Sequence, residues 1–391
     1  MQMKPISGHP TLHEEMKAWR HALHQQPELG FLERATADFI IGKLREFGVH
    51  EIATGIGKTG IVATLRNGSG NKSIAFRADM DALPIQEVRD HKYRSQNPGV
   101  MHACGHDGHV TMLLGAAKVL SQAPDYDGII HLIFQPSEEN GKGMNAMLDD
   151  GLLRRFPFEE IYGLHNRPGM PVGHFATRHG AFMAAEDNFK IVIKGRGGHS
   201  GCPHDHNDAL LTACATVMNL QNIVSRRIDP SQFSIVSVTE MNTDGLRNKI
   251  AGAAILLGDV RSYDKQVSLK IEAEMRRIVE TTAAMFQSDV EVEYTREFIP
   301  LINEAATTKH ALETAVLVTG DEDRVTGDDR RLGSSEDFAQ VLEHVPGNFM
   351  NLGNGDSAAL HNSEYDFDDE ALPYGVQYYV ELARHRLGKK V

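Results

Sequence analysis

The chain has 391 residues, of which 41% are hydrophobic and 24% charged, as in ordinary soluble globular proteins. At ~150 residues per domain, this length predicts two or three domains. The net charge of −13, with no basic stripe, argues against a nucleic-acid partner. Residues 1–10 lack a leader pattern and no apolar run reaches the ~20 residues that cross a bilayer, so we expect no membrane contact. An odd count of three cysteines fits a reducing compartment, and we expect a cytoplasmic protein.

Helices and short apolar strands alternate along the first part of the chain. Periodicity and end signals predict helices over residues 12–26, 33–47 and 110–120 and strands over 61–65, 73–77, 128–134 and 161–164. A further strand is expected at 348–352 and a final helix at 369–387. Nearly continuous apolar strands that alternate with helices predict an α/β domain with a mixed, largely parallel sheet sandwiched by helices.

The pattern changes between residues 186 and 297. Alternating or β-rich runs at 189–193, 232–239, 249–263 and 290–294 combine with helical patterns at 208–225 and 267–278. The resulting order, β-α-β-β-α-β, is that of a ferredoxin-like α+β domain. We therefore expect a first domain segment at 1–185, an inserted domain at 186–297, and a return to the first domain at 298–391.

Residues 101–109 contain five side chains that can bind a metal or transfer a proton: His102, Cys104, His106, Asp107 and His109. More such groups lie just beyond the carboxyl ends of predicted strands: Asp79, Asp81, Glu138, Glu139, His165 and His361. In open α/β sheets this edge is where ligands bind. The sequence therefore predicts a metal site there.

Cys104, His106, Glu139, His165 and His361 make five ligands, which suits two metals that share one ligand better than one open tetrahedral site. A thiolate, imidazoles and a carboxylate fit Zn²⁺, Mn²⁺, Co²⁺ or Ni²⁺ and do not fit Mg²⁺ or Ca²⁺. Successive side chains of a strand point to opposite sides, so only one of Glu138 and Glu139 should bind metal. The other is then a general base.

Seven segments together resemble the motifs of the M20 metallopeptidase family, in particular its amidohydrolase branch: Arg77-Ala-Asp-Met-Asp81-Ala-Leu-Pro84, Met101-His-Ala-Cys-Gly-His-Asp-Gly-His109, Gln135-Pro-Ser-Glu-Glu139, Gly163-Leu-His-Asn166, Gly197-Gly-His-Ser200, Ser335-Glu-Asp-Phe338 and Leu360-His-Asn362. That branch contains hippurate hydrolases, N-acyl-amino-acid deacylases and indole-acetyl-amino-acid hydrolases. The resemblance implies a zinc-peptidase-like catalytic domain with two divalent ions, Mn²⁺ or Zn²⁺, or else Co²⁺ or Ni²⁺. It also implies an inserted lid through which the protein forms a homodimer, or a tetramer.

The resemblance also assigns roles to single residues. Cys104 would bridge the two ions, Glu138 would be the base, and His199 of the lid would stabilise the oxyanion from its own or the partner subunit. Asp81 joins the catalytic set. Asn248 and Arg261 look like the lid residues that contact the substrate, although the segment around Asn248 lacks the proline usual in the family.

Other potential ligands receive supporting or structural roles. His102, Asp107 and His109 are interpreted as supports of the ligands. Cys202 and His204 are interpreted as part of a lid loop.

The expected activity is hydrolysis of the amide bond of small N-acyl-L-amino acids. One alternative is a dipeptidase or carbamoyl-amino-acid hydrolase on the same scaffold, whose members usually carry Asp where this chain has Cys104. A second alternative is a non-catalytic binding protein, but neither the base nor any ligand is missing here. The acyl group, the amino acid, the stereochemistry and the native metal stay open.

Overall fold

The computed structural model describes residue 9 and residues 11–388, and its contacts divide the chain into two compact units. The larger unit contains the chain up to Gly180, Ile302–Arg330 and the chain from Asp337 onward. The smaller unit contains Ala181–Leu301 and Arg331–Glu336. The domain boundaries expected from the sequence stay a prediction. We expect no leader pattern in residues 1–10, and all of these residues except His9 lie outside the described part of the chain.

The larger unit is built on an eight-stranded mixed sheet with the strand order β1-β2-β4-β3-β5-β16-β6-β15. Its four central strands, β4, β3, β5 and β16, run parallel, whereas β1 and β2 pair antiparallel at one side. The strands are β1 (Glu51–Ile56), β2 (Gly60–Asn67), β3 (Ser73–Asp79), β4 (Gly128–Gln135), β5 (Glu160–Arg167), β6 (Phe175–Ala176), β15 (Val325–Thr326) and β16 (Gly347–Gly353).

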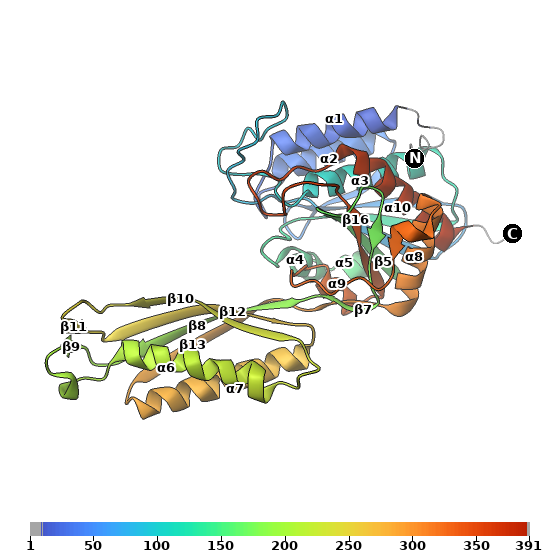
Figure 1. The fold of residues 1–391 in the computed structure, drawn as a ribbon. Coiled ribbons are helices and arrows are strands. Elements are labelled where there is room, and N and C mark those ends of the chain that lie inside the picture. Colours follow the sequence, from blue (N-terminus) through green and yellow to red (C-terminus); the bar gives the residue numbers. More distant parts are fainter. Residues whose placement is uncertain (1–8, 10, 389–391) are drawn as a thin grey trace. The chain divides into compact units, whose positions relative to one another are not determined.

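Burial explains the apolar composition of the central strands. Every residue of β3 and β16 is buried, as expected for parallel strands covered on both faces. The helices of this unit are α1 (Leu12–Gln25), α2 (Arg34–Glu46), α3 (His106–Gln122), α4 (Gly143–Asp149), α5 (Leu152–Arg155), α8 (Ala305–Thr319), α9 (Ala339–Leu342) and α10 (Leu372–Leu387). α3 and α10 pack on each other and on β3, while α4 packs on β4 (Figure 1). The fold is therefore the α/β sandwich that the sequence predicts.

The smaller unit is an antiparallel four-stranded sheet with the order β10-β12-β8-β13 and two helices, α6 and α7. Its elements are β8 (Ala185–Lys194), β9 (Gly198–His199), α6 (Ala209–Asn222), β10 (Ser234–Thr243), β11 (Lys249–Ile250), β12 (Ala253–Ser262), α7 (Lys265–Met285) and β13 (Asp289–Phe298). Burial alternates along β8 and β12, so one face of the sheet packs on the helices. The order of strands and helices is the ferredoxin-like arrangement predicted for this region.

Local signals set several element ends. Asp208 and Asp264 accept hydrogen bonds from the first backbone amides of α6 and α7, which makes them N-caps. Gly48 follows α2 with φ +84°, the left-handed conformation of a helix C-cap. Thr11 precedes α1 but does not cap it, because its hydroxyl donates to Glu15 instead.

Several boundaries differ from the sequence-based prediction. α3 begins at His106 and not at residue 110, so half of the 101–109 motif lies inside the helix. The predicted strand 249–263 is broken into β11 and β12, where Gly252 passes close to the backbone of Gly197. The helix predicted to reach residue 225 is α-helical to Asn222 and then continues as a π-helical turn over Ile223–Arg227.

Within the described residues, no helix combines the length and apolar character needed to cross a membrane. Cys104, Cys202 and Cys214 are all free thiols, as an odd cysteine count suggested. The cytoplasmic location stays a prediction.

Candidate metal centre

The candidate site lies in the larger unit, where the carboxyl ends of parallel strands meet the start of α3. His165 lies in β5, and Glu138 and Glu139 follow β4 directly. His106 is the first residue of α3, and Cys104 precedes the N-cap Gly105 of this helix. The backbone N–H of His361 donates to the carbonyl of Ala103 at 2.8 Å, which holds the distant 361 loop against the Cys104 segment. The topology thus brings together five side chains that the sequence placed on one sheet edge.

These five side chains form two groups of three that share Cys104. One group is Cys104, His106 and His165, and the other is Cys104, Glu139 and His361, with the ligand atoms of each group within 4.8 Å of one another. The Sγ of Cys104 lies 3.5 Å from Nε2 of His165, and Nε2 of His361 lies 3.3 Å from a Glu139 oxygen. Two ligand groups that share one thiolate are an arrangement that can hold two neighbouring ions.

Hydrogen bonds fix which nitrogen of two histidines faces the centre. Nδ1 of His106 donates to the carbonyl of Asp81 at 2.9 Å, and Nδ1 of His165 donates to the carbonyl of Asn166 at 2.7 Å. A carbonyl oxygen only accepts, so the proton of each neutral ring is on Nδ1 and the lone pair is on Nε2. Metal-binding histidines are oriented in this way.

Unsatisfied polar atoms also converge on this point. Nε2 of His106 and Oε1 of Glu139 are buried, lie 3.8 Å apart, and have no hydrogen-bond partner among the described residues. Burial, reinforced by Glu139 and Glu138, raises the pKa of the Cys104 thiol well above its usual value. A thiolate there needs a compensating cation, so the residues present fit a divalent metal.

His109 belongs to the same cluster but has no nitrogen left for an ion. Its Nδ1 donates to Asp79 at 2.6 Å, and its Nε2 accepts from the backbone N–H of Asn166 at 3.0 Å. Asp79 is held in turn by Arg77 at 2.7 Å. Although Asp79, His106 and His109 lie close enough to hold an ion, these bonds favour a supporting role for Asp79 and His109.

Glu138 lies on a strained turn beside the two ligand groups. The preceding Ser137 has φ +55°, which is uncommon for a side chain that is not glycine. The backbone N–H of Ser137 donates to the buried Glu33 at 2.8 Å, and its Oγ accepts from Asn140. The turn, and not the alternation of a regular strand, separates Glu138 from Glu139: Glu139 reaches the histidines, while Glu138 accepts a long hydrogen bond from the N–H of Asp337.

Asp81 holds two of the candidate ligands. Its carbonyl accepts from His106, and its carboxylate accepts from the N–H of Glu139 at 3.1 Å. One carboxylate oxygen is also 3.3 Å from Nδ1 of His106. This geometry favours positioning of the ligands over direct participation in proton transfer.

Asp337 is a functional candidate to which the sequence analysis gave no role. Its carboxylate accepts from Gln135 at 2.6 Å, from Arg77 at 3.2 Å and from the N–H of Met144 at 2.9 Å. Through its own N–H it contacts Glu138. The Ser335-Glu-Asp-Phe338 motif was the available signal, but its partners lie about 200 positions earlier in the chain.

The lid candidates lie on the smaller unit, and two of them are neighbours. His199 on β9 pairs with Lys249 on β11, next to Asn248, and both His199 and Asn248 are exposed. The N–H of Gly201 donates to Nδ1 of His199 at 3.0 Å, which leaves the proton of the neutral ring on Nε2. His199 can therefore donate a hydrogen bond to an oxyanion.

Arg261 lies at the other end of the same unit. It pairs with Glu186 at 2.8 Å, Asp259 at 2.6 Å and Ser335 at 2.8 Å. Along β12, eight residues separate it from Ala253, a span of about 26 Å. His199 and Asn248 lie beyond the Ala253 end, so the three predicted lid residues are not brought together within one chain.

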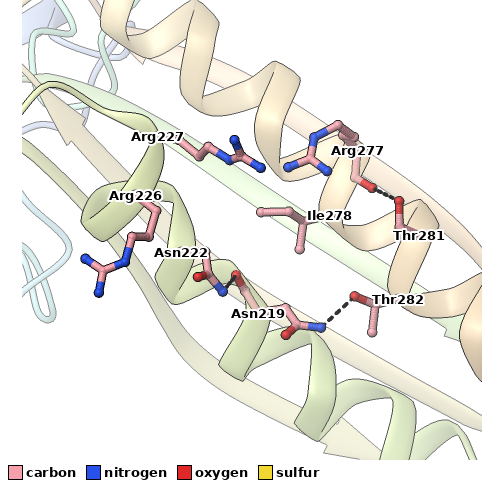
Figure 2. Close-up of a pocket in the computed structure, with 8 residues that line it drawn as sticks. All are labelled: Asn219, Asn222, Arg226, Arg227, Arg277, Ile278, Thr281 and Thr282. Atoms are coloured by element: carbon pink, nitrogen blue, oxygen red, sulfur yellow. Dashed lines mark hydrogen bonds between the residues drawn. The ribbon is translucent and has the colours of Figure 1, made fainter.

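A pocket of about 440 Å³ on the smaller unit lies between α6 and α7 (Figure 2). The guanidinium groups of Arg227 and Arg277 point toward each other across it, and Arg226 points away. Glu274 pairs with Arg277 at 2.6 Å and with Arg227 at 3.5 Å, so one carboxylate offsets part of this positive charge. Among the described residues, those that line the pocket carry amide, hydroxyl and guanidinium groups together with the side chain of Ile278.

The chain is similar to several known proteins and to one family of peptidases. A model of peptidase family M20/M25/M40 matches residues 75–385. A hippurate hydrolase of Campylobacter jejuni is 37% identical over 374 residues, covering 95% of this chain and 96% of its own length. An N-acetyl-L-cysteine deacetylase of Bacillus subtilis is 35% identical over 381 residues, covering 96% and 89%. A crystal structure from Bacillus subtilis, described as a dinuclear metal binding peptidase of the M20 family, is similar with a TM-score of 0.83 at 32% identity, covering 96% and 99%.

Proposed function

Because the chain belongs to peptidase family M20/M25/M40, in its amidohydrolase branch, and is an enzyme of amide hydrolysis, we propose that it cleaves N-acyl-L-amino acids with a binuclear metal centre. The products are a carboxylic acid and a free amino acid. The observation that carries the proposal is the pair of ligand groups that share Cys104, with Glu138 beside them.

Cys104, His106, Glu139, His165 and His361 are the residues that would hold the two ions. Bound there, divalent ions such as Mn²⁺ or Zn²⁺ supply Lewis acidity to the scissile carbonyl and to the attacking water. The tautomers of His106 and His165 and the unpartnered oxygen of Glu139 support this ligand set.

Glu138 is the proposed general base and acid. Its carboxylate takes the proton of the attacking water and returns it to the leaving amide nitrogen, so the net reaction consumes one water per bond cleaved. The buried turn at Ser137 and the N–H of Asp337 hold this carboxylate in place. Asp81 acts as a positioning residue through His106 and Glu139.

The smaller unit contributes the proposed lid residues. His199 donates its Nε2 proton to the oxyanion, Asn248 lies beside it, and Arg261 binds the substrate carboxylate. Arg261 must exchange Glu186 or Asp259 for that carboxylate. The separation along β12 supports a site completed by His199 and Asn248 of a second copy of this chain, in a homodimer formed through the lid.

The test is a substrate panel on metal-stripped protein supplied with Mn²⁺, Zn²⁺ or Co²⁺. The panel contains N-acetyl-, N-benzoyl- and indole-acetyl-amino acids, with dipeptides and N-carbamoyl-amino acids as competing classes. We expect release of free amino acid from the acyl compounds. Release only from dipeptides or carbamoyl compounds would contradict the substrate class, and no release with any metal would contradict the activity.

Glu138→Gln is the matched variant for this panel. It keeps the size of the side chain and removes its basicity, so turnover should fall by about 10²- to 10⁴-fold while the metal content stays at the wild-type level. Wild-type turnover in Glu138→Gln, with metal bound, would exclude Glu138 as the base.

A further inference from the structure

A second cluster of metal-binding side chains joins α8 to α10, away from every residue of the candidate metal centre. It consists of His310 and Glu313 on α8 and His385 on α10, whose ligand atoms lie within 4.8 Å of one another. The two helices pack against each other in the larger unit (Figure 1). We propose that His310, Glu313 and His385 bind one further divalent ion of the Zn²⁺ class, which ties the last helix of the chain to α8.

The hydrogen bonds of Thr314 determine the tautomer of His385. The hydroxyl of Thr314 donates to the carbonyl of His310 at 2.8 Å, so its single proton is used. Its oxygen is 3.1 Å from Nδ1 of His385 and can only accept there. The neutral ring of His385 therefore carries its proton on Nδ1 and presents the Nε2 lone pair to Glu313.

His310 presents a second nitrogen without a partner. Its Nδ1 is buried, makes no hydrogen bond within the described part of the chain, and lies 3.7 Å from Oε2 of Glu313. The Nε2 of His385 lies 3.6 Å from the same oxygen. Both distances exceed those of hydrogen bonds, so in the described part of the chain no hydrogen bond joins either nitrogen to this carboxylate oxygen.

The spacing is close to that of a coordination shell. Tetrahedral zinc with ligand bonds of about 2.0–2.2 Å places neighbouring ligand atoms roughly 3.3 Å apart. The observed 3.6 and 3.7 Å need a contraction of only a few tenths of an ångström. His310 and Glu313 are three residues apart on one helix face, so the helix already holds two of the three ligands together.

The charges around the cluster leave the carboxylate available. Arg386, next to His385, is engaged by both oxygens of Glu160 at 2.6 and 2.8 Å. Lys309 approaches the other oxygen of Glu313 at 3.8 Å and is 73% exposed. All three ligands are partly exposed, which leaves room for water to complete the shell. Two imidazoles and one carboxylate suit Zn²⁺, Co²⁺ or Ni²⁺ better than Mg²⁺ or Ca²⁺.

The test compares the zinc content of variants of the full-length protein. Wild type, His385→Gln, Glu313→Gln and the control His50→Gln are stripped of metal, loaded with Zn²⁺, desalted, and analysed for zinc per chain by mass spectrometry. His50 is an exposed histidine outside the cluster. Because only differences between variants are used, the result does not depend on how many ions the Cys104 centre holds.

We expect His385→Gln and Glu313→Gln each to hold one zinc fewer per chain than wild type and His50→Gln. We also expect Zn²⁺ to raise the melting temperature of wild type by more than it raises that of these two variants, because an ion bound to the native state stabilises it. Equal zinc content in all four proteins would overturn the proposal.

Thr314→Val keeps all three ligands but removes the acceptor for Nδ1 of His385, and should weaken zinc binding by about 10- to 100-fold. Unchanged affinity in Thr314→Val would overturn the tautomer assignment on which the proposal rests.

Discussion

The imidazoles of His106, His165 and His109 lie in one cluster but offer different atoms to a ligand. In His106 and His165, Nδ1 donates a hydrogen bond to a backbone carbonyl, so the Nε2 lone pair faces the centre. The third uses one nitrogen to donate and the other to accept. In His385 and His199, the hydrogen-bond partner of Nδ1 likewise determines which nitrogen of the neutral ring carries the proton. At the scale of single residues, the partner of the far nitrogen therefore separates candidate ligands from supports.

Gly105 directly precedes His106 and fixes the backbone conformation at the start of α3. It is the N-cap of α3 with φ +87°, and a Cβ there would lie 2.3 Å from Nδ2 of Asn166 and 2.4 Å from the Tyr365 hydroxyl oxygen. Gly105→Ala should cost roughly 2 kcal/mol or more of folding free energy, because it adds a steric clash to a left-handed conformation. It should also lower metal content, because the displaced Asn166 Nδ2 donates to the carbonyl of Cys104 at 2.6 Å. Denaturant unfolding and metal analysis of the purified variant check both.

Gly42→Ala is the matched control. Gly42 lies inside α2, and a Cβ there meets nothing within 4 Å. This change should raise the free energy of unfolding by about 0.5–1 kcal/mol and leave metal content alone. If the two variants behaved alike, the role given to Gly105 would be wrong.

At the scale of elements, buried strands and amphipathic helices were the parts best predicted from sequence. The run Ile129 to Phe134 is nearly all apolar because β4 lies between neighbours in a covered sheet, and this is a local signal. The break between β11 and β12 has no such signal, since it depends on the approach of Gly252 to Gly197. α3 begins four residues before its apolar run because its first turn, residues 106–109, is buried although it is polar.

The candidate site was predictable as a set of residue types, and the structure brings the five expected ligands together. Their roles as ligands stay a proposal. The surroundings of Glu138 were not predictable from the sequence. Asp337, whose N–H donates to Glu138, lies about 200 positions away in the chain, and Glu33, which accepts from the N–H of Ser137, lies about 100 positions away. Hydrogen bonds over such distances leave no periodicity in the sequence.

At the scale of the whole molecule, we propose that His199 of a second copy completes the active site, because β12 separates His199 from Arg261. Since His199 and Arg261 lie at opposite ends of the smaller unit, mixing two inactive variants should restore activity. Glu138→Gln and His199→Ala, each nearly inactive alone, should give about a quarter of the wild-type rate after equal mixing and subunit exchange, because half of the dimers then contain one intact site. Hydrolysis of the best N-acyl-amino acid before and after exchange measures this. A mixture that stays at the rate of the separate variants would mean that His199 serves its own chain.

We propose above all that Cys104 is shared by two metal ions. Anomalous diffraction from crystals grown with Mn²⁺ or Zn²⁺, recorded on both sides of the metal absorption edge, tests it most directly. We expect two peaks about 3.5–4 Å apart, one beside Cys104, His106 and His165 and the other beside Cys104, Glu139 and His361. A single peak, or peaks that leave Cys104 without a metal neighbour, would contradict it.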